Sequence, residues 1–122
     1  MYVHNQKATE ADVQALRRAG GRWLRDLRTR RGLSQRQMAK EVGAEYYTFI
    51  SQLENGRGRI PPDRYKAWAA SLGVPAPTFV FNLMRFYDPV TFEILFDKDG
   101  KFSGDPARFS VIASDDDEAE TA

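Results

Sequence analysis

The stretch from Leu33 to Gly56 constrains the fold more than any other part of the chain. Ser34 is a helix N-cap, and Gln37 three residues later completes a capping box. Gly43 supplies a turn position at which a left-handed backbone costs little. A second apolar pattern follows and ends at Asn55. The stretch therefore predicts two short helices joined by a tight turn.

Apolar residues at helical spacing also flank this stretch. They predict helices over residues 22–31, 63–72 and 78–87. Residues 90–96 alternate between apolar and polar side chains, and this period of two predicts a strand, followed by a turn at 97–100 and a short return strand. The predicted fold class is all-α: a five-helix domain with a short C-terminal β-strand or hairpin.

Four regions follow from these patterns. Residues 1–19 are expected to form an N-terminal arm that includes at most a short helix, because Gly20-Gly21 is expected to break it. Residues 20–74 form the core domain, and residues 75–102 contribute a helix and the β segment. Residues 103–122 carry few apolar and many acidic side chains and are predicted to be a disordered acidic tail.

Positive charge is concentrated in one block. Residues 17–66 contain 13 Lys and Arg against 5 Asp and Glu, whereas the other residues hold 5 basic and 12 acidic side chains. A basic block that coincides with the two predicted short helices favours a polyanion partner, namely a nucleic acid. The other interpretation is a solvated charged surface.

Composition argues against several other functions. The chain has no cysteine and one histidine, His4, and it shows no phosphate loop or metal-spaced cluster. We therefore expect no enzyme activity, no cofactor and no metal. It has no run of 18 apolar residues and no apolar signal-peptide core, so we expect a cytoplasmic, nucleoid-associated protein with no membrane contact.

Residues 20–73 resemble the Cro/phage-repressor-like helix-turn-helix family, also called the XRE family. The matching features are Gln35, Ala39, Gly43 and the run Ile50-Ser-Gln-Leu-Glu-Asn-Gly56 with Arg57 and Arg59 after it. The resemblance implies a lambda-repressor-like fold and sequence-specific binding to duplex DNA, with the second short helix as the recognition helix.

The resemblance also assigns roles to individual residues. Gln52 would pair with adenine in the major groove, and Gln35 would contact phosphate. Arg28 and Glu54 would form an internal ion pair. The full set of implied DNA-binding residues is Gln35, Arg36, Tyr46, Tyr47, Thr48, Ser51, Gln52, Asn55, Arg57 and Arg59.

The chain departs from the family in the turn. Six residues separate Gly43 from Ile50, where the family usually has five. The extra residue either rotates the start of the recognition helix or lengthens the turn. We further expect one of Tyr46 and Tyr47 to be buried.

The predicted function is a transcriptional regulator, more specifically a repressor that binds a palindromic operator as a homodimer. The predicted helix 78–87 carries more apolar surface than one core needs, and either a second subunit or the C-terminal segment would cover the remainder. Helix 78–87 and strand 90–96 are therefore the candidates for dimerisation. The dimerisation residues would be Phe79, Leu83, Phe86, Tyr87, Phe92 and Ile94. The alternative is an antitoxin-type regulator that binds a partner protein through residues 78–122.

Overall fold

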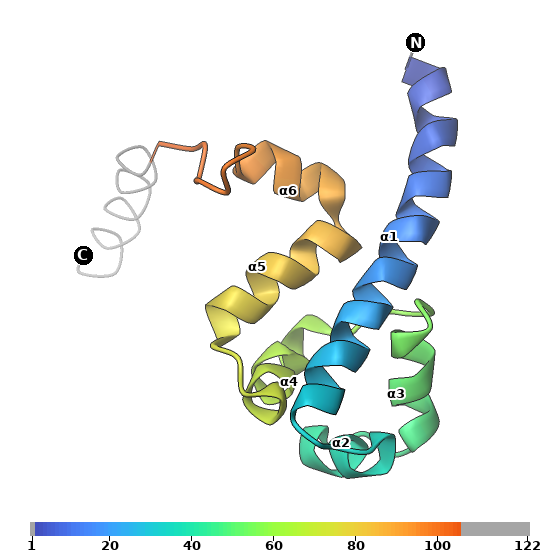
Figure 1. Cartoon of the computed structure of the whole chain (residues 1–122). Coiled ribbons are helices and arrows are strands. Elements are labelled where there is room, and N and C mark those ends of the chain that lie inside the picture. Colours follow the sequence, from blue (N-terminus) through green and yellow to red (C-terminus); the bar gives the residue numbers. More distant parts are fainter. Residues whose placement is uncertain (1, 106–122) are drawn as a thin grey trace, which may run out of the picture. The chain divides into compact units, whose positions relative to one another are not determined.

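The computed structural model describes residues 2–105 of the chain, and side chains from residue 12 onward. The structure consists of two compact units, one up to Pro89 and one from Val90. The first unit contains α1 (Tyr2–Arg30), α2 (Gln35–Val42), α3 (Tyr47–Glu54), a 3-10 helix (Pro62–Arg64), α4 (Tyr65–Leu72) and α5 (Ala76–Tyr87). The predicted all-α class is confirmed for this unit (Figure 1).

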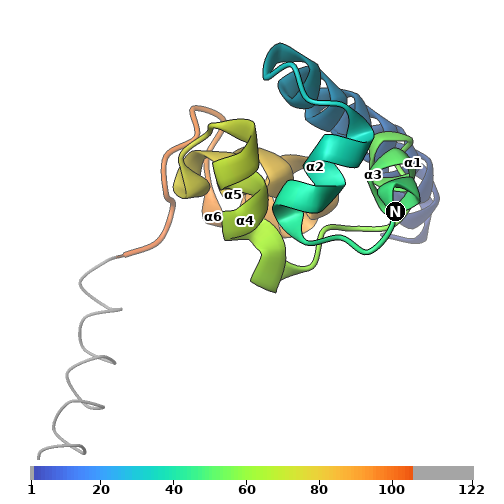
Figure 2. The same ribbon diagram turned by 90° about the horizontal axis from the view of Figure 1, so that it is seen from below.

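The core of the first unit is built around α1. Helices α3 and α5 pack against different sides of α1, and α2 packs against α3 and α4 (Figures 1 and 2). Leu24 of α1 is 1% exposed, because it lies where these helices converge. The other large side chains that are almost completely buried are Met38, Ile50, Leu53, Ile60, Trp68, Phe79 and Leu83. Helical spacing of apolar residues therefore predicted the core side of α2, α3 and α4 correctly.

The local signals at α2 are confirmed in detail. Ser34 Oγ accepts a hydrogen bond from the Gln37 amide at 3.1 Å, and Gln37 Oε1 accepts one from the Ser34 amide at 2.7 Å. At the other end Gly43 has φ 72°, and its amide donates to the carbonyls of Ala39 and Lys40. Because both caps satisfy backbone groups locally, α2 begins and ends where the sequence predicts.

The predicted break at Gly20-Gly21 is wrong. Helix α1 continues through both glycines. The reason is close packing: a Cβ on Gly21 would lie 2.7 Å from the Glu54 carbonyl carbon, and one on Gly20 would lie 2.8 Å from Phe86 Cβ. The two glycines thus allow α3 and α5 to approach the backbone of α1, and they do not act as helix breakers.

The predicted strand at residues 90–96 is also wrong. Pro89–Leu95 forms α6, which lies in the second unit apart from its first residue. Pro89 fits the first position of a helix because its φ is preset and its missing amide hydrogen would have no partner there. Phe92 and Phe96 are four residues apart, so a helical backbone brings their rings to a centroid distance of 5.0 Å.

Of the predicted hairpin, one isolated β-bridge is present after α6. Phe96 and Phe102 form an antiparallel bridge around the turn that begins at Asp97. Asp97 Oδ1 accepts hydrogen bonds from the amides of Asp99 and Lys101, which closes this turn. Most of the predicted acidic tail, from residue 106 on, lies outside the described residues.

Three of the predicted dimerisation residues are core residues instead. Phe79, Leu83 and Tyr87 are 0%, 1% and 6% exposed within the first unit. Phe86 is partly buried, with its ring 5.5 Å from that of Trp23. The width of the apolar arc on α5 therefore reflects its contacts with α1 and α4, and a second subunit cannot reach the three core side chains in this fold.

Gly21→Ala should destabilise the protein although alanine is the better helix former. Overlap with the Glu54 carbonyl should cost about 1–3 kcal/mol, more than the helix propensity gain of about 1 kcal/mol. Urea unfolding followed by circular dichroism measures the difference. Gln14→Ala, at an exposed position of the same helix, is the control and should be nearly neutral. A Gly21→Ala protein as stable as the wild type would contradict the close packing.

Candidate nucleic-acid interface

Helix α3 presents one polar face and buries the other. Ile50 and Leu53 are 0% and 2% exposed, and they attach the helix to the core. Thr48, Gln52 and Asn55 are exposed. At about 100° per residue these three positions fall on one narrow stripe of the helix surface, which continues into its C-cap. The stripe has the amide and hydroxyl groups that hydrogen-bond to base edges.

The turn before α3 runs from Gly43, the C-cap of α2, to Tyr46. Tyr46 is the N-cap with an extended backbone (φ −128°, ψ 137°), and the helix starts at Tyr47. From Tyr47 onward the phase is uninterrupted, because Ile50 and Leu53 both reach the core.

Both tyrosines at the start of α3 are exposed. Tyr46 is 65% and Tyr47 is 39% exposed, so the prediction that one of them is buried is wrong. The Arg36 guanidinium of α2 lies over the Tyr47 ring, 4.2 Å from its centroid. This cation–π contact joins the exposed surfaces of α2 and α3 and holds a positive charge beside the polar stripe.

A buried ion pair fixes the other end of α3. The pair joins Arg28 of α1 to Glu54: Arg28 Nε is 2.5 Å from Glu54 Oε2, and Arg28 Nη2 donates to Glu54 Oε1 at 3.0 Å. Arg28 Nη1 donates to the Leu33 carbonyl at 2.7 Å. Gln35 Nε2 also donates to Glu54 Oε1, at 3.0 Å. The pair implied by the family resemblance is thus present, and part of the Gln35 amide is engaged inside the protein.

The loop after α3 carries two exposed arginines, Arg57 and Arg59. The Arg57 amide donates to the Gln52 carbonyl at 2.8 Å, so the loop starts tightly against the end of α3. Gly56 and Gly58 have φ values of 81° and 75°, which a side chain would strain. The glycines therefore allow the sharp path that places two cations directly after the polar stripe.

Sequence reasoning missed the surroundings of Tyr87. Its ring has two guanidinium neighbours, since the Cζ atoms of Arg17 and Arg59 each lie 5.3 Å from the ring centroid. Its hydroxyl accepts a hydrogen bond from the Ile60 amide at 3.4 Å. Burial raises the pKa of Tyr87 above its usual range, although the hydrogen bond and the two cations act in the opposite direction. The sequence signal that could have indicated these contacts is Gly20-Gly21, because the pair marks where α3 and α5 approach α1.

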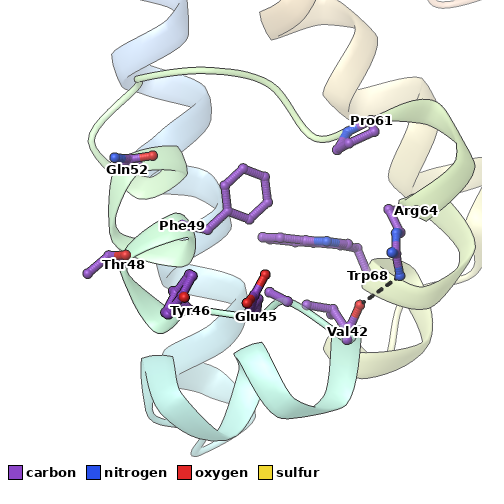
Figure 3. A pocket seen from close by; sticks show the side chains of 11 residues that line it. Val42, Glu45, Tyr46, Thr48, Phe49, Gln52, Pro61, Arg64 and Trp68 are labelled. Atoms are coloured by element: carbon purple, nitrogen blue, oxygen red, sulfur yellow. Dashed lines mark hydrogen bonds between the residues drawn. The ribbon is translucent and has the colours of Figure 1, made fainter.

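An open pocket of about 540 Å³ borders the polar stripe (Figure 3). Thr48 and Gln52 lie on one side of it, and Arg64 on the opposite side. Phe49 and Trp68 point into it, so its inner surface is aromatic. Arg64 Nη1 donates to the Val42 carbonyl at 3.5 Å, which links the start of α4 to the end of α2. A group that filled this pocket would contact Thr48 and Gln52 of the polar stripe.

Two further observations concern residues 2–105. No group of three or more His, Cys, Asp or Glu side chains in this part of the chain could hold a metal ion. None of the helices described there is long and apolar enough to span a membrane.

Glu54→Ala should lower the free energy of unfolding by about 3–5 kcal/mol, because it leaves the Arg28 guanidinium buried without its counter-charge. Urea unfolding gives the value. Arg30→Ala, at an exposed position of α1, the helix that carries Arg28, is the control. It should change stability by less than about 0.5 kcal/mol. The double variant Arg28→Met/Glu54→Ala should recover part of the loss. Strictly additive effects of the two substitutions would show that the pair carries no coupling energy.

The comparisons with known proteins concern the same segment. Residues 24–79 match a family model described as helix-turn-helix, and the match runs from the last two turns of α1 to the first turn of α5. A search of curated proteins finds no match. The predicted resemblance over residues 20–73 is confirmed by this finding. Residues 24–79 therefore match an XRE-type helix-turn-helix, a domain found in DNA-binding transcription regulators.

Proposed function

We propose that the protein recognises a specific sequence of duplex DNA and represses transcription as a homodimer on a palindromic operator. One observation carries the proposal: the exposed stripe of α3, with Thr48 and Gln52, lies between Arg36 at one end and Arg57 at the other. Base-reading groups flanked by cations suit a helix that enters the major groove between two phosphate backbones.

In this proposal Gln52 carries most of the direct readout. Its side-chain amide can donate and accept at once, which matches the N6 and N7 atoms of adenine. Thr48, one turn earlier on the same stripe, offers a hydroxyl for a base edge and a methyl for contact with thymine. Ser51 and Tyr47 lie on the flank of the stripe and reach neighbouring bases or the backbone. Tyr46, which precedes the helix, contacts the edge of the groove.

The cations and the remaining amides hold the phosphates. Arg36, Arg57 and Arg59 neutralise backbone charge, and each phosphate contact that replaces a condensed counterion makes binding more salt-dependent. Asn55 at the end of the stripe donates a neutral hydrogen bond. Gln35 keeps the second hydrogen of its amide for a phosphate, because only one bond to Glu54 is present.

A single recognition helix reads only a few base pairs, which is why we propose a dimer. Two-fold symmetry would place the two α3 helices about 34 Å apart, one turn of DNA. With Phe79, Leu83 and Tyr87 in the core, Phe92 and Ile94 of α6 are the remaining predicted contacts, beside the partly buried Phe86. Ile94 is 71% exposed, and an unpaired apolar side chain of this kind gains by burial in a subunit interface.

The second candidate is an antitoxin-type regulator that binds a partner protein through residues 78–122. The exposed apolar side chains of the second unit favour it, since Val90 and Phe102 are 57% and 54% exposed in addition to Ile94. Co-purification from the native host separates the two readings. A homodimer without a second protein supports the repressor. A stoichiometric partner that is lost when residues 90–122 are deleted supports the antitoxin.

A repressor of this kind would act by occlusion. Occupation of an operator that overlaps a promoter blocks access of the polymerase, without any catalytic step by the protein. It would work in the cytoplasm on nucleoid DNA. Genome-wide mapping of bound DNA would locate the operators. The first site to inspect in such a map is the promoter of the protein's own gene.

Gln52→Ala should weaken binding to the selected operator by about 1–3 kcal/mol and leave binding to unrelated duplex unchanged. The operator is first obtained by in vitro selection from a random duplex library, and fluorescence anisotropy then measures both affinities. An unchanged sequence preference of Gln52→Ala would contradict the placement of α3 in the groove.

Arg57→Ala is the matched comparison for this experiment. Because Arg57 is proposed to contact only phosphate, its loss should weaken binding to every duplex alike. The slope of log K against log salt concentration should flatten by about one unit. A change of sequence preference in Arg57→Ala would assign base readout to the loop instead.

A further inference from the structure

Helix α1 meets the loop after α3 at a close junction. Arg17 Nη1 donates a hydrogen bond to the Gly58 carbonyl at 3.3 Å. A Cβ on Gly56 would lie 2.9 Å from both the Cα and the amide nitrogen of Arg18, so only glycine fits there. The arginines of the loop and the arginines of this turn of α1 therefore share one surface region, which lies beside the C-terminal end of α3 (Figure 1).

Four arginines converge here, and we call them the basic junction: Arg17, Arg18, Arg57 and Arg59. Arg17 and Arg59 share the Tyr87 ring, so their Cζ atoms are at most about 10.6 Å apart. This separation is comparable to the Debye length of about 8–10 Å, so the two charges repel each other. Among the described residues none of the four arginines forms a salt bridge, because the Arg28–Glu54 pair takes the nearby carboxylate.

Arg17 has one group that the protein leaves unsatisfied. Its Nε is buried without a hydrogen-bond partner in the described part of the chain. A buried donor on a cation costs free energy unless an acceptor reaches it. An anion that approached the junction would offset the repulsion between the guanidiniums.

The direction of Arg18 follows from the phase of α1. Gly21 faces α3, because it lies against the Glu54 backbone. Gly20 faces α5, because it lies against Phe86. Trp23 also faces α5, because its ring packs against those of Phe79 and Phe86. At 100° per residue Arg18 lies about 60° beyond Gly21, away from the side that faces α5. Arg18 is exposed. Its side chain therefore leaves α1 on the side of the recognition helix.

We propose that the basic junction binds a phosphate of the DNA backbone next to the bases read by α3, so that Arg17 and Arg18 extend the interface onto α1, outside the segment 24–79 that matches the family. The inference rests on the proposed binding to duplex DNA. Arginine suits such a site, because its planar fork matches phosphate oxygens and stays charged. Arg57 and Arg59 link the junction to the end of the polar stripe.

Arg18→Gln tests the inference, because its exposed side chain is not needed for folding. Loss of one phosphate contact should flatten the salt slope on the selected operator by about 0.9. At 0.15 M salt this corresponds to a loss of affinity of about fivefold. Sequence preference should not change. The measurement is anisotropy with the full chain between 50 and 300 mM KCl, with thermal unfolding to show equal stability.

Arg30→Gln is the matched control. It makes the same charge change on the same helix, also at an exposed position. Arg30 lies seven residues after Trp23, hence on the side of α1 away from α3, and about 18 Å along the axis from Arg18. Its salt slope should equal that of the wild type. Equal losses in both variants would mean a general effect of net charge and would overturn the inference.

Ethylation interference gives a second readout that does not depend on affinity. In the wild type, ethylation of one phosphate per half-site should interfere with binding. In Arg18→Gln the interference at this phosphate should be lost, and Arg17→Gln should lose it at the same phosphate. If Arg18→Gln keeps the full footprint and the full salt slope while the wild type binds its operator, the junction does not contact DNA and only this inference fails. If the wild type selects no duplex sequence, the proposed function fails as well.

Discussion

The position of α3 depends on the buried pair between Arg28 and Glu54. The two charges lie in the interior, where each would be costly alone, and the two hydrogen bonds between them fit only one arrangement of α1 against α3. The same guanidinium holds the Leu33 carbonyl, and the same carboxylate holds Gln35. One interaction therefore joins α1, the turn before α2, the first residue of α2 and the last residue of α3. The orientation of the polar stripe follows from it.

Close backbone contacts complete this arrangement. Gly21 allows the end of α3 to touch α1, and Gly56 allows the following loop to touch α1 one turn earlier. Because the inner side of α3 is pressed against α1 in this way, Thr48 and Gln52 can only face outward. The same contacts bring Arg17 and Arg18 beside Arg57 and Arg59. The close packing that stabilises the recognition helix thus also produces the concentration of positive charge proposed to bind phosphate.

In the second unit the local sequence pattern predicts secondary structure less clearly. In residues 90–96 the period of two is compatible with a strand, yet positions 92 and 96 are also neighbours on a helix. Pro89 and the contact between the Phe92 and Phe96 rings favour the helix. Periodicity alone could not decide, because the segment is short and a strand needs a partner to bond with. The proposed protein contacts, with a second copy or with another protein, are assigned to the exposed apolar side chains of this unit.

The sequence by itself determined α2 and the existence of α3, with the capping box at Ser34 and the left-handed turn at Gly43, because these signals act over three or four residues. It also indicated the Arg28–Glu54 pair and the XRE-type family, since several residues at fixed spacing carry that resemblance. Only the tertiary structure decided whether Gly20-Gly21 breaks α1, whether Phe79 and Leu83 face a core or a partner, and that Arg17 lies beside the loop after α3. Each of these depends on contacts between residues tens of positions apart, which no local pattern encodes.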